Sequence, residues 1–204
     1  MTITKIEPLT KAKFKVYVDE QFAFVLYKGE LSRFQIKENG HITEELFEKI
    51  NTDVILKRAK LRAMHLLNDM DRTEGQLRQK LKLNGYTEEI IDRAMSYIKS
   101  FGYINDKNYI RRFIESRMDK KSRKEIYASL LQKGLKQEDI EEAFEEIYDA
   151  GSEVQAIREL ARKRRFNPQE ADNAERQKFC AYLARKGFCY EDIRQVIQVS
   201  SWNA

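Results

Sequence analysis

The chain has 204 residues, of which 42% are hydrophobic and 35% are charged, and its formal net charge is +5. No segment reaches the roughly 20 apolar residues that a membrane-spanning helix needs, and the first residues do not resemble a signal peptide. We therefore expect a cytoplasmic protein with no membrane contact. Neither the cysteines (Cys180, Cys189) nor the histidines (His41, His65) have the spacing of metal ligands, which predicts no metal and no cofactor.

The first part of the chain differs in pattern from the rest. In KFKVYV (13–18) apolar residues alternate with Lys and Tyr, and after two acidic residues the apolar run FAFVLY (22–27) follows. This alternation predicts a β-hairpin. We expect a further extended piece around 34–37, closed by an Asn-Gly turn, and then a helix capped by Thr43. Residues 1–53 are therefore predicted to form a small β module with an attached helix.

From about residue 51 onward the sequence repeats a helical unit. The segments NGYTEEII, KGLKQEDI and KGFCYEDI align on Gly85, Gly134 and Gly187, each with Leu four residues before and Ile six residues after the glycine. These glycines are 49 and 53 residues apart, and a second pair, Gly102 and Gly151, is also 49 apart. Because glycine adopts the left-handed conformation without steric cost, such glycines are typical of helix ends.

Helix starts are predicted where Ser, Thr or Asn precedes Glu or Gln by three residues, the spacing of a capping box. We assign predicted helix starts to four positions with this spacing, Thr73, Ser122, Ser152 and Asn167. They give three helices per repeat of about 50 residues. The predicted fold is mainly α, with three tandem three-helix repeats that form an elongated curved body after the β module. The expected boundaries are 1–53, 54–103, 104–151 and 152–204.

The basic residues are unevenly distributed among the repeats. Residues 54–103 carry ten bases and six acids, and residues 152–204 carry ten bases and seven acids. The middle repeat is nearly neutral only because a basic cluster at 120–124 precedes seven acids between 138 and 149. Basic clusters can neutralise phosphates or contact an acidic protein surface. The alternative for any one cluster is a solvated helix face with internal ion pairs.

The sequence offers little support for catalysis. No phosphate-binding loop, dinucleotide fingerprint, zinc-hydrolase motif or nucleophile elbow occurs. His65 lies in the apolar-periodic stretch LRAMHLL, which favours a structural or exposed histidine over a general base. The aromatic residues between 97 and 127 fall at helical spacing, so we expect them to pack in the core and not to stack on bases. We therefore predict that the chain is not an enzyme and has no small-molecule substrate.

Three strings carry a family resemblance. LRQKLKLNGY at 77–86, FGYINDKNY at 101–109 and LLQKGLKQEDI at 130–140 resemble the RecX family of recombination regulators. The resemblance covers residues 54–199, and the N-terminal extension is similar to that of members from Gram-positive bacteria. It implies that the chain binds the RecA recombinase and its nucleoprotein filament, inhibits ATP hydrolysis and strand exchange, and limits filament growth. Because stacked repeats form a long single face that suits a helical groove, we expect the chain to lie in the filament groove or to cap filament growth.

The bases of the repeats are the candidate contacts to the recombinase or to DNA phosphates. They are Arg72, Arg78, Lys80, Lys82, Arg111, Arg112, Arg117, Lys120, Lys121, Arg123, Lys124, Arg162, Lys163, Arg164, Arg165, Lys178, Arg185 and Lys186. The family often has a second basic residue before an Arg-Ser pair, where this chain reads Met-Asp-Arg-Thr at 70–73, and often has Lys or Arg in place of Asn84. For a recombinase regulator, a direct contact with single- or double-stranded DNA stays open. The alternative is a stand-alone helix-turn-helix-like protein that binds duplex DNA, and a helical scaffold for another protein comes third.

Overall fold

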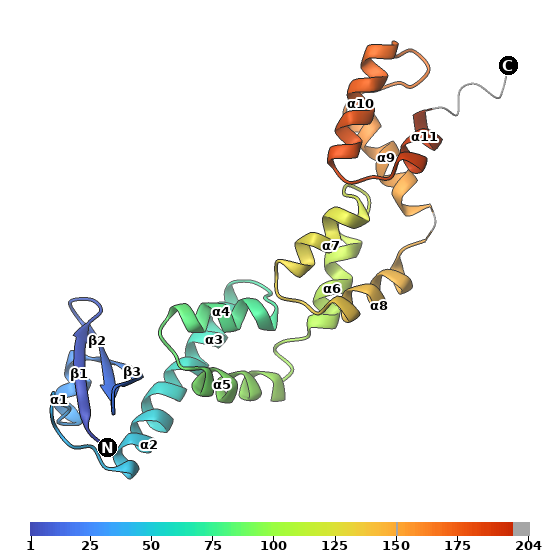
Figure 1. The fold of residues 1–204 in the computed structure, drawn as a ribbon. Coiled ribbons are helices and arrows are strands. Elements are labelled where there is room, and N and C mark those ends of the chain that lie inside the picture. Colours follow the sequence, from blue (N-terminus) through green and yellow to red (C-terminus); the bar gives the residue numbers. More distant parts are fainter. Residues whose placement is uncertain (150, 198–204) are drawn as a thin grey trace. The chain divides into compact units, whose positions relative to one another are not determined.

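The computed structural model describes residues 1–149 and 151–197 of the chain. It contains two compact units, residues 1–105 (unit 1) and residues 106–204 (unit 2). Figure 1 shows strands only in the N-terminal part and helices along the rest of the described chain. None of the helices in the described residues is long and apolar enough to cross a membrane.

Unit 1 combines a three-stranded antiparallel sheet with helices. The strands are β1 (Ile3–Pro8), β2 (Lys13–Val18) and β3 (Gln21–Tyr27), in the order β1-β2-β3. The helices are α1 (Lys28–Arg33), α2 (Glu44–Ile50), the π-helical turn η1 (Asn51–Leu56), α3 (Lys57–Asp69), α4 (Glu74–Leu83) and α5 (Glu88–Ser100).

The predicted hairpin is confirmed. Strands β2 and β3 pair in antiparallel register from Lys13 opposite Tyr27 to Val18 opposite Gln21. The turn between them places Asp19 and Glu20 at positive φ. The alternating apolar residues of β2 therefore face one side of the sheet, where Val16 and Val18 are buried.

The prediction of an extended piece around 34–37 is wrong. This segment closes helix α1 instead, because the Phe34 amide donates to the Glu30 carbonyl and the Ile36 amide donates to the Leu31 carbonyl. The third strand is β1, which pairs with β2 through an irregular register near its start. That irregularity breaks the two-residue period by which the sequence reveals a strand.

The sheet and the first helices share one hydrophobic core. Buried residues of the strands pack with Ile55 and Leu56 of η1 and with Ile90 and Ala94 of α5. A second cluster, which includes Leu66, Leu77 and Ile98, joins α3, α4 and α5. The helix predicted after Thr43 is confirmed as α2, and the Thr43 hydroxyl accepts a hydrogen bond from the Leu46 amide.

Unit 2 contains six helices in its described residues. They are α6 (Asp106–Glu115), α7 (Arg123–Leu131), α8 (Gln137–Ile147), α9 (Ser152–Lys163), α10 (Asn173–Arg185) and α11 (Tyr190–Ile197). The first three helices enclose a core around Ile114, Leu130 and Phe144, and the last three enclose a separate core around Ile157 and Leu183. The structure is thus mainly α, with three helices in each repeat. The last seven residues of the predicted range 152–204 lie outside the described residues.

Most of the repeat glycines end helices as predicted. Gly85, Gly102, Gly134 and Gly187 all have positive φ, between 70° and 89°. Gly151 differs from its expected counterpart Gly102, because it has a φ of −95° and precedes α9 instead of ending a helix.

Two of the four predicted helix starts need correction. The caps at Thr73 and Ser122 are confirmed. Ser152 is already inside α9, whose cap is the preceding glycine. Asn167 starts no helix, because its side chain accepts from the Gln169 amide in a turn, and α10 begins only after the cap Asp172.

The prediction for the aromatic residues holds only in part. Phe113 is buried in the core of α6, α7 and α8, with Tyr109 and Tyr127 packed against that core. Phe101 and Tyr103, however, are 58% and 54% exposed and stack on each other at 5.8 Å between ring centroids. They follow the end of α5, beyond the last buried turn of the helix, so the helical period no longer applies to them.

Candidate functional site

In unit 1, most candidate bases already have partners within the chain. The Arg78 guanidinium lies 3.0 Å from Glu74 and 2.6 Å from Asp92, and these hydrogen bonds, with Asp92 first, raise its pKa. Lys82 lies 2.7 Å from Glu88. Arg72 donates from Nε to the Leu66 carbonyl at 3.0 Å. Lys80 is exposed on α4, and the structure gives it no side-chain partner among the described residues.

In unit 2, the acidic run of α8 faces the bases of α6. Lys107 pairs with Glu142 at 2.7 Å, and Arg111 pairs with Glu146. The acids that follow the basic cluster in the sequence therefore neutralise a different helix. Glu142 and Glu146 of α8 therefore do not neutralise the bases at the start of α7.

The start of α7 meets the end of α10. The Ser122 hydroxyl donates to the Lys186 carbonyl at 2.6 Å, and it also accepts from the Glu125 amide as the helix cap. The Glu125 carboxylate lies 2.6 Å from the Lys121 ammonium and 3.7 Å from that of Lys186. Candidate bases of the second and third repeats, 65 residues apart in sequence, are thus brought together around one carboxylate.

Tyr182 extends this group toward the end of α9. The Arg164 guanidinium lies 3.7 Å from the centre of the Tyr182 ring, and the Lys186 ammonium lies 5.6 Å from it. A cation held over an aromatic face keeps its charge while losing part of its motion. Beside Tyr182 lies a cavity of about 450 Å³, whose lining includes Arg164, Arg165 and Lys178. Two acids, Glu170 and Glu175, also line it.

We call the bases connected in this way the unit 2 basic surface. Its members are Lys121, Lys124, Arg164, Arg165, Lys178 and Lys186. Lys124 belongs to it because its side chain lies against Gly187, next to Lys186.

The other unit 2 candidates lie outside this definition. Arg162 pairs with Glu159 at 2.8 Å, and Arg117 lies over the Phe113 ring. Arg123 lies over Phe144. Four further candidates are exposed: Arg112, Lys120, Lys163 and Arg185.

The titratable groups of unit 2 do not point to nucleophilic chemistry. Burial raises the pKa of the Cys180 thiol. A hydrogen bond to Asp192 raises the pKa of the Cys189 thiol. Raised pKa values leave both thiols protonated and poorly nucleophilic at neutral pH. Within the described residues there is also no group of three or more His, Cys, Asp or Glu side chains that could hold a metal.

The sequence did not identify the residues that organise the basic surface. Tyr182 and Ser122 carry no charge, and Glu125 has the wrong sign for a phosphate contact. Ser122 and Glu125 were visible only as a capping box, and no sequence signal connects them to Lys186. The sequence signal for this contact is the spacing of Tyr182 and Lys186, which lie four residues apart and therefore on the same face of a helix.

Comparison of the chain with known proteins identifies its family. Family models described as the first, second and third three-helix domains of RecX match residues 59–97, 105–143 and 152–197. A protein of Caldanaerobacter subterraneus subsp. tengcongensis named "Regulatory protein RecX" is 35% identical and covers 98% of this chain and 100% of its own length. A protein of the same name from Clostridioides difficile is 30% identical and covers 96% of this chain and 93% of its own.

Solved structures agree with this match at the level of the fold. A crystal structure of regulatory protein RecX has a TM-score of 0.63 at 24% identity and covers 97% of this chain and 98% of its own. A crystal structure of RecX from Lactobacillus salivarius has a TM-score of 0.57 at 24% identity and covers 70% of this chain and 94% of its own. The family models and the full-length relatives together show that this chain belongs to the RecX family.

Proposed function

We propose that this chain is a negative regulator of homologous recombination in the cytoplasm. It binds the RecA recombinase or its filament on DNA, inhibits ATP hydrolysis and strand exchange, and limits filament growth. The observation that carries this proposal is the full-length match to proteins named regulatory protein RecX. In this role the chain modulates a catalyst and performs no chemistry itself.

The positive charges of the unit 2 basic surface also support the proposal. Arg164 and Lys186 are held on one aromatic ring. The exposed Lys124 lies against Gly187, and the exposed Lys178 lines the same cavity as Arg164. Such a surface can contact DNA phosphates or carboxylates of a protein groove, and each phosphate contact releases counterions. Lys80, Arg112 and the other bases without a place in this surface are proposed as further contacts.

The test is the rate of ATP hydrolysis by the host recombinase on single-stranded DNA during titration with this protein. The variant Lys124→Glu/Lys178→Glu/Arg165→Glu should lose most of the inhibition, because it reverses three exposed charges of the surface. The matched control Lys11→Glu/Lys28→Glu/Lys37→Glu makes the same change in net charge on exposed unit 1 lysines outside the candidate set, and it should inhibit normally. Equal inhibition by both variants contradicts the proposed surface.

Stoichiometry separates the two modes of action. Inhibition at far less than one protein per recombinase monomer indicates end capping or sparse blocking of the groove, whereas a near-equimolar requirement indicates occupation of the groove along its length. If saturating protein has no effect on hydrolysis but binds duplex DNA tightly without recombinase, the chain is instead a stand-alone DNA-binding protein. If the protein neither affects ATP hydrolysis nor binds DNA, the results favour a helical scaffold for another protein.

A further inference from the structure

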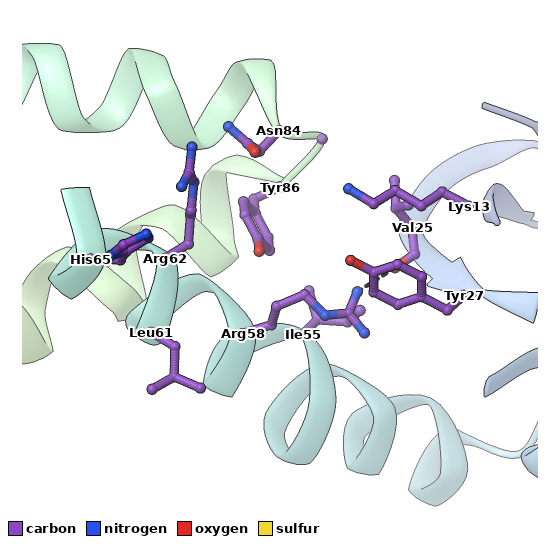
Figure 2. A pocket seen from close by; sticks show the side chains of 11 residues that line it. Lys13, Val25, Tyr27, Ile55, Arg58, Leu61, Arg62, His65, Asn84 and Tyr86 are labelled. Atoms are coloured by element: carbon purple, nitrogen blue, oxygen red, sulfur yellow. Dashed lines mark hydrogen bonds between the residues drawn. The ribbon is translucent and has the colours of Figure 1, made fainter. Parts of the chain in front are cut away.

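Unit 1 contains a cavity that the candidate set does not include. It has a volume of about 510 Å³ and lies where the sheet, helix α3 and the turn between α4 and α5 meet. This volume falls within the range of about 300–1,000 Å³ that is usual for small-molecule sites. Figure 2 shows Lys13 and Tyr27 reaching in from the sheet, Arg58, Arg62 and His65 from α3, and Asn84 and Tyr86 from the turn.

The lining is basic. It includes Lys13, Arg58, Arg62 and His65, and no Asp or Glu is among the described residues that line the cavity. Arg58 is partly neutralised, because it forms an ion pair with Glu30 just outside the cavity and donates to the Val25 carbonyl at 3.1 Å. Lys13 lies over the ring of Tyr27 at 5.5 Å, a contact that leaves its charge in place.

Arg62 is the member whose charge is least compensated. It is half-buried, and the structure gives its side chain no hydrogen bond and no ion pair within the described residues. Its Nε is fully buried without an acceptor. Burial of an unpaired guanidinium N–H is unfavourable, since proteins normally supply an acceptor for such groups. Figure 2 shows the guanidinium pointing from α3 toward the turn at Asn84.

The cavity walls are held in place by close packing. Gly85 has a φ of +83°, and a Cβ at this position would lie 3.0 Å from the Val25 side chain of β3. The turn therefore lies directly against the sheet. Tyr86 is partly buried and packs against both cores of unit 1. Donors on three separate elements thus converge on one space whose shape is fixed by the core.

We propose that this cavity binds a phosphate group, carried either by a free nucleotide or by a single strand of DNA. A phosphate presents oxygens in tetrahedral directions and fits donors that converge from different elements, whereas a carboxylate offers two oxygens in one plane. It supplies the counter-charge that Arg62 lacks. The volume of about 510 Å³ is larger than a phosphate group alone requires. This inference does not rest on the proposed function, because the cavity binds its ligand without the recombinase.

The experiment is a titration of the full-length protein, labelled with ¹⁵N, followed through the backbone amides of Gly85 and Tyr86. The probes are inorganic phosphate, ADP and a short single-stranded oligo-dT, each compared with sodium chloride at equal ionic strength. We expect saturable shifts at these amides. Arg62→Gln should weaken binding by about tenfold, which is typical of losing one charge-assisted hydrogen bond. Lys13→Gln, on a different element, should also weaken it.

Two control variants keep the result interpretable. Lys37→Gln removes an exposed charge of unit 1 that does not line the cavity, and it should bind normally. Arg62→Lys keeps the charge and should bind more tightly than Arg62→Gln, which separates loss of charge from loss of folding. Tighter binding of ADP identifies a free nucleotide as the source, and tighter binding of oligo-dT identifies the strand.

Several outcomes would overturn the inference. They are no saturable shift with any of the three probes, shifts that Arg62→Gln and Lys13→Gln leave unchanged, and tighter binding of a poly-glutamate peptide than of all phosphate probes. Because recombinase is absent from these measurements, such a failure leaves the proposed inhibition of ATP hydrolysis untouched. Conversely, phosphate binding here does not rescue that proposal if hydrolysis is unaffected.

Discussion

At the scale of single residues, two glycines with the same backbone conformation face different surroundings. Gly85 and Gly102 have φ of +83° and +70°, but a Cβ at Gly85 would lie 3.0 Å from Val25, whereas a Cβ at Gly102 meets nothing within 4 Å. Alanine at positive φ costs about 1–2 kcal/mol. We expect Gly102→Ala to lower the free energy of unfolding by about this amount, and Gly85→Ala by about 1–3 kcal/mol more through overpacking. Denaturant unfolding of unit 1 measures both, and equal losses would contradict the packing against β3.

The half-buried carboxylate of Glu153 makes the stability of unit 2 depend on pH. Glu153 accepts hydrogen bonds from the Arg123 amide and, at 3.3 Å, from the Tyr148 hydroxyl. Burial nevertheless raises its pKa above the usual 4.5. The folded state therefore binds this proton more readily than the unfolded state. The resulting stabilisation is fully present below the unfolded pKa and is lost as pH rises through the folded pKa.

This sign gives a prediction for Glu153→Gln. The amide resembles the protonated acid at every pH, so the stability of the natural protein relative to the variant should fall as pH rises above 4.5 and through the raised pKa of Glu153. Thermal unfolding of the two proteins across this range gives the difference directly, because the other titrating groups are common to both. A difference that grows with pH would mean that the hydrogen bonds from Arg123 and Tyr148 outweigh burial.

At the scale of helices, Ser122 connects two repeats through one hydroxyl. It caps α7 and also donates to the Lys186 carbonyl at the end of α10. Ser122→Ala removes a cap, worth about 1 kcal/mol, and leaves a carbonyl without its partner, which adds about 1–3 kcal/mol. We expect faster hydrogen exchange at the amides of both α7 and the turn after α10. Thr43→Ala removes only the cap of α2 and should leave exchange in unit 2 unchanged; no change after α10 in Ser122→Ala would contradict the connection.

The helices were predictable from the sequence wherever the signal was local. The glycine at a helix end and the capping hydroxyl at a helix start act within one turn, so Thr43, Thr73 and Ser122 were identified correctly. Asn167 failed because an Asn side chain stabilises a turn as readily as it caps a helix. The strand β1 was missed because the register shift between Ile3 and Lys5 interrupts the alternation of apolar and polar residues along it.

The candidate bases were predictable as residues but not as a surface. The sequence gives the number and position of the charges, whereas their partners depend on tertiary contacts. Arg111, which the sequence favours as a contact, is paired with Glu146 of another helix. Arg62 lies in an apolar-periodic stretch and is not one of the candidate bases. It has no ion pair in the described chain and lines a cavity with Lys13, 49 residues away.

At the scale of the whole molecule, the cores do not follow the boundaries that the repeat pattern predicts. The expected division after residue 53 cuts through one core, because buried strand residues pack with Ile55, Leu56, Ile90 and Ala94. Among the described residues, the cores of the two three-helix groups in unit 2 are formed by residues of unit 2. The repeat pattern shows which helices are similar in sequence. The hydrophobic cores show which segments pack together and therefore stabilise each other.

This difference predicts how fragments behave. A fragment of residues 1–105 contains both cores of unit 1 and should unfold cooperatively with near-native helix content. A fragment of residues 54–105 keeps α3, α4 and α5 but exposes the side chains that the sheet covers. Each fully buried aliphatic side chain contributes about 1.5–3 kcal/mol, so exposing Ile55, Leu56 and Ile90 removes a large share of the stability of a small domain. Circular dichroism in increasing denaturant gives the free energy of unfolding of each fragment. Equal values for the two fragments would support a domain boundary at residue 53.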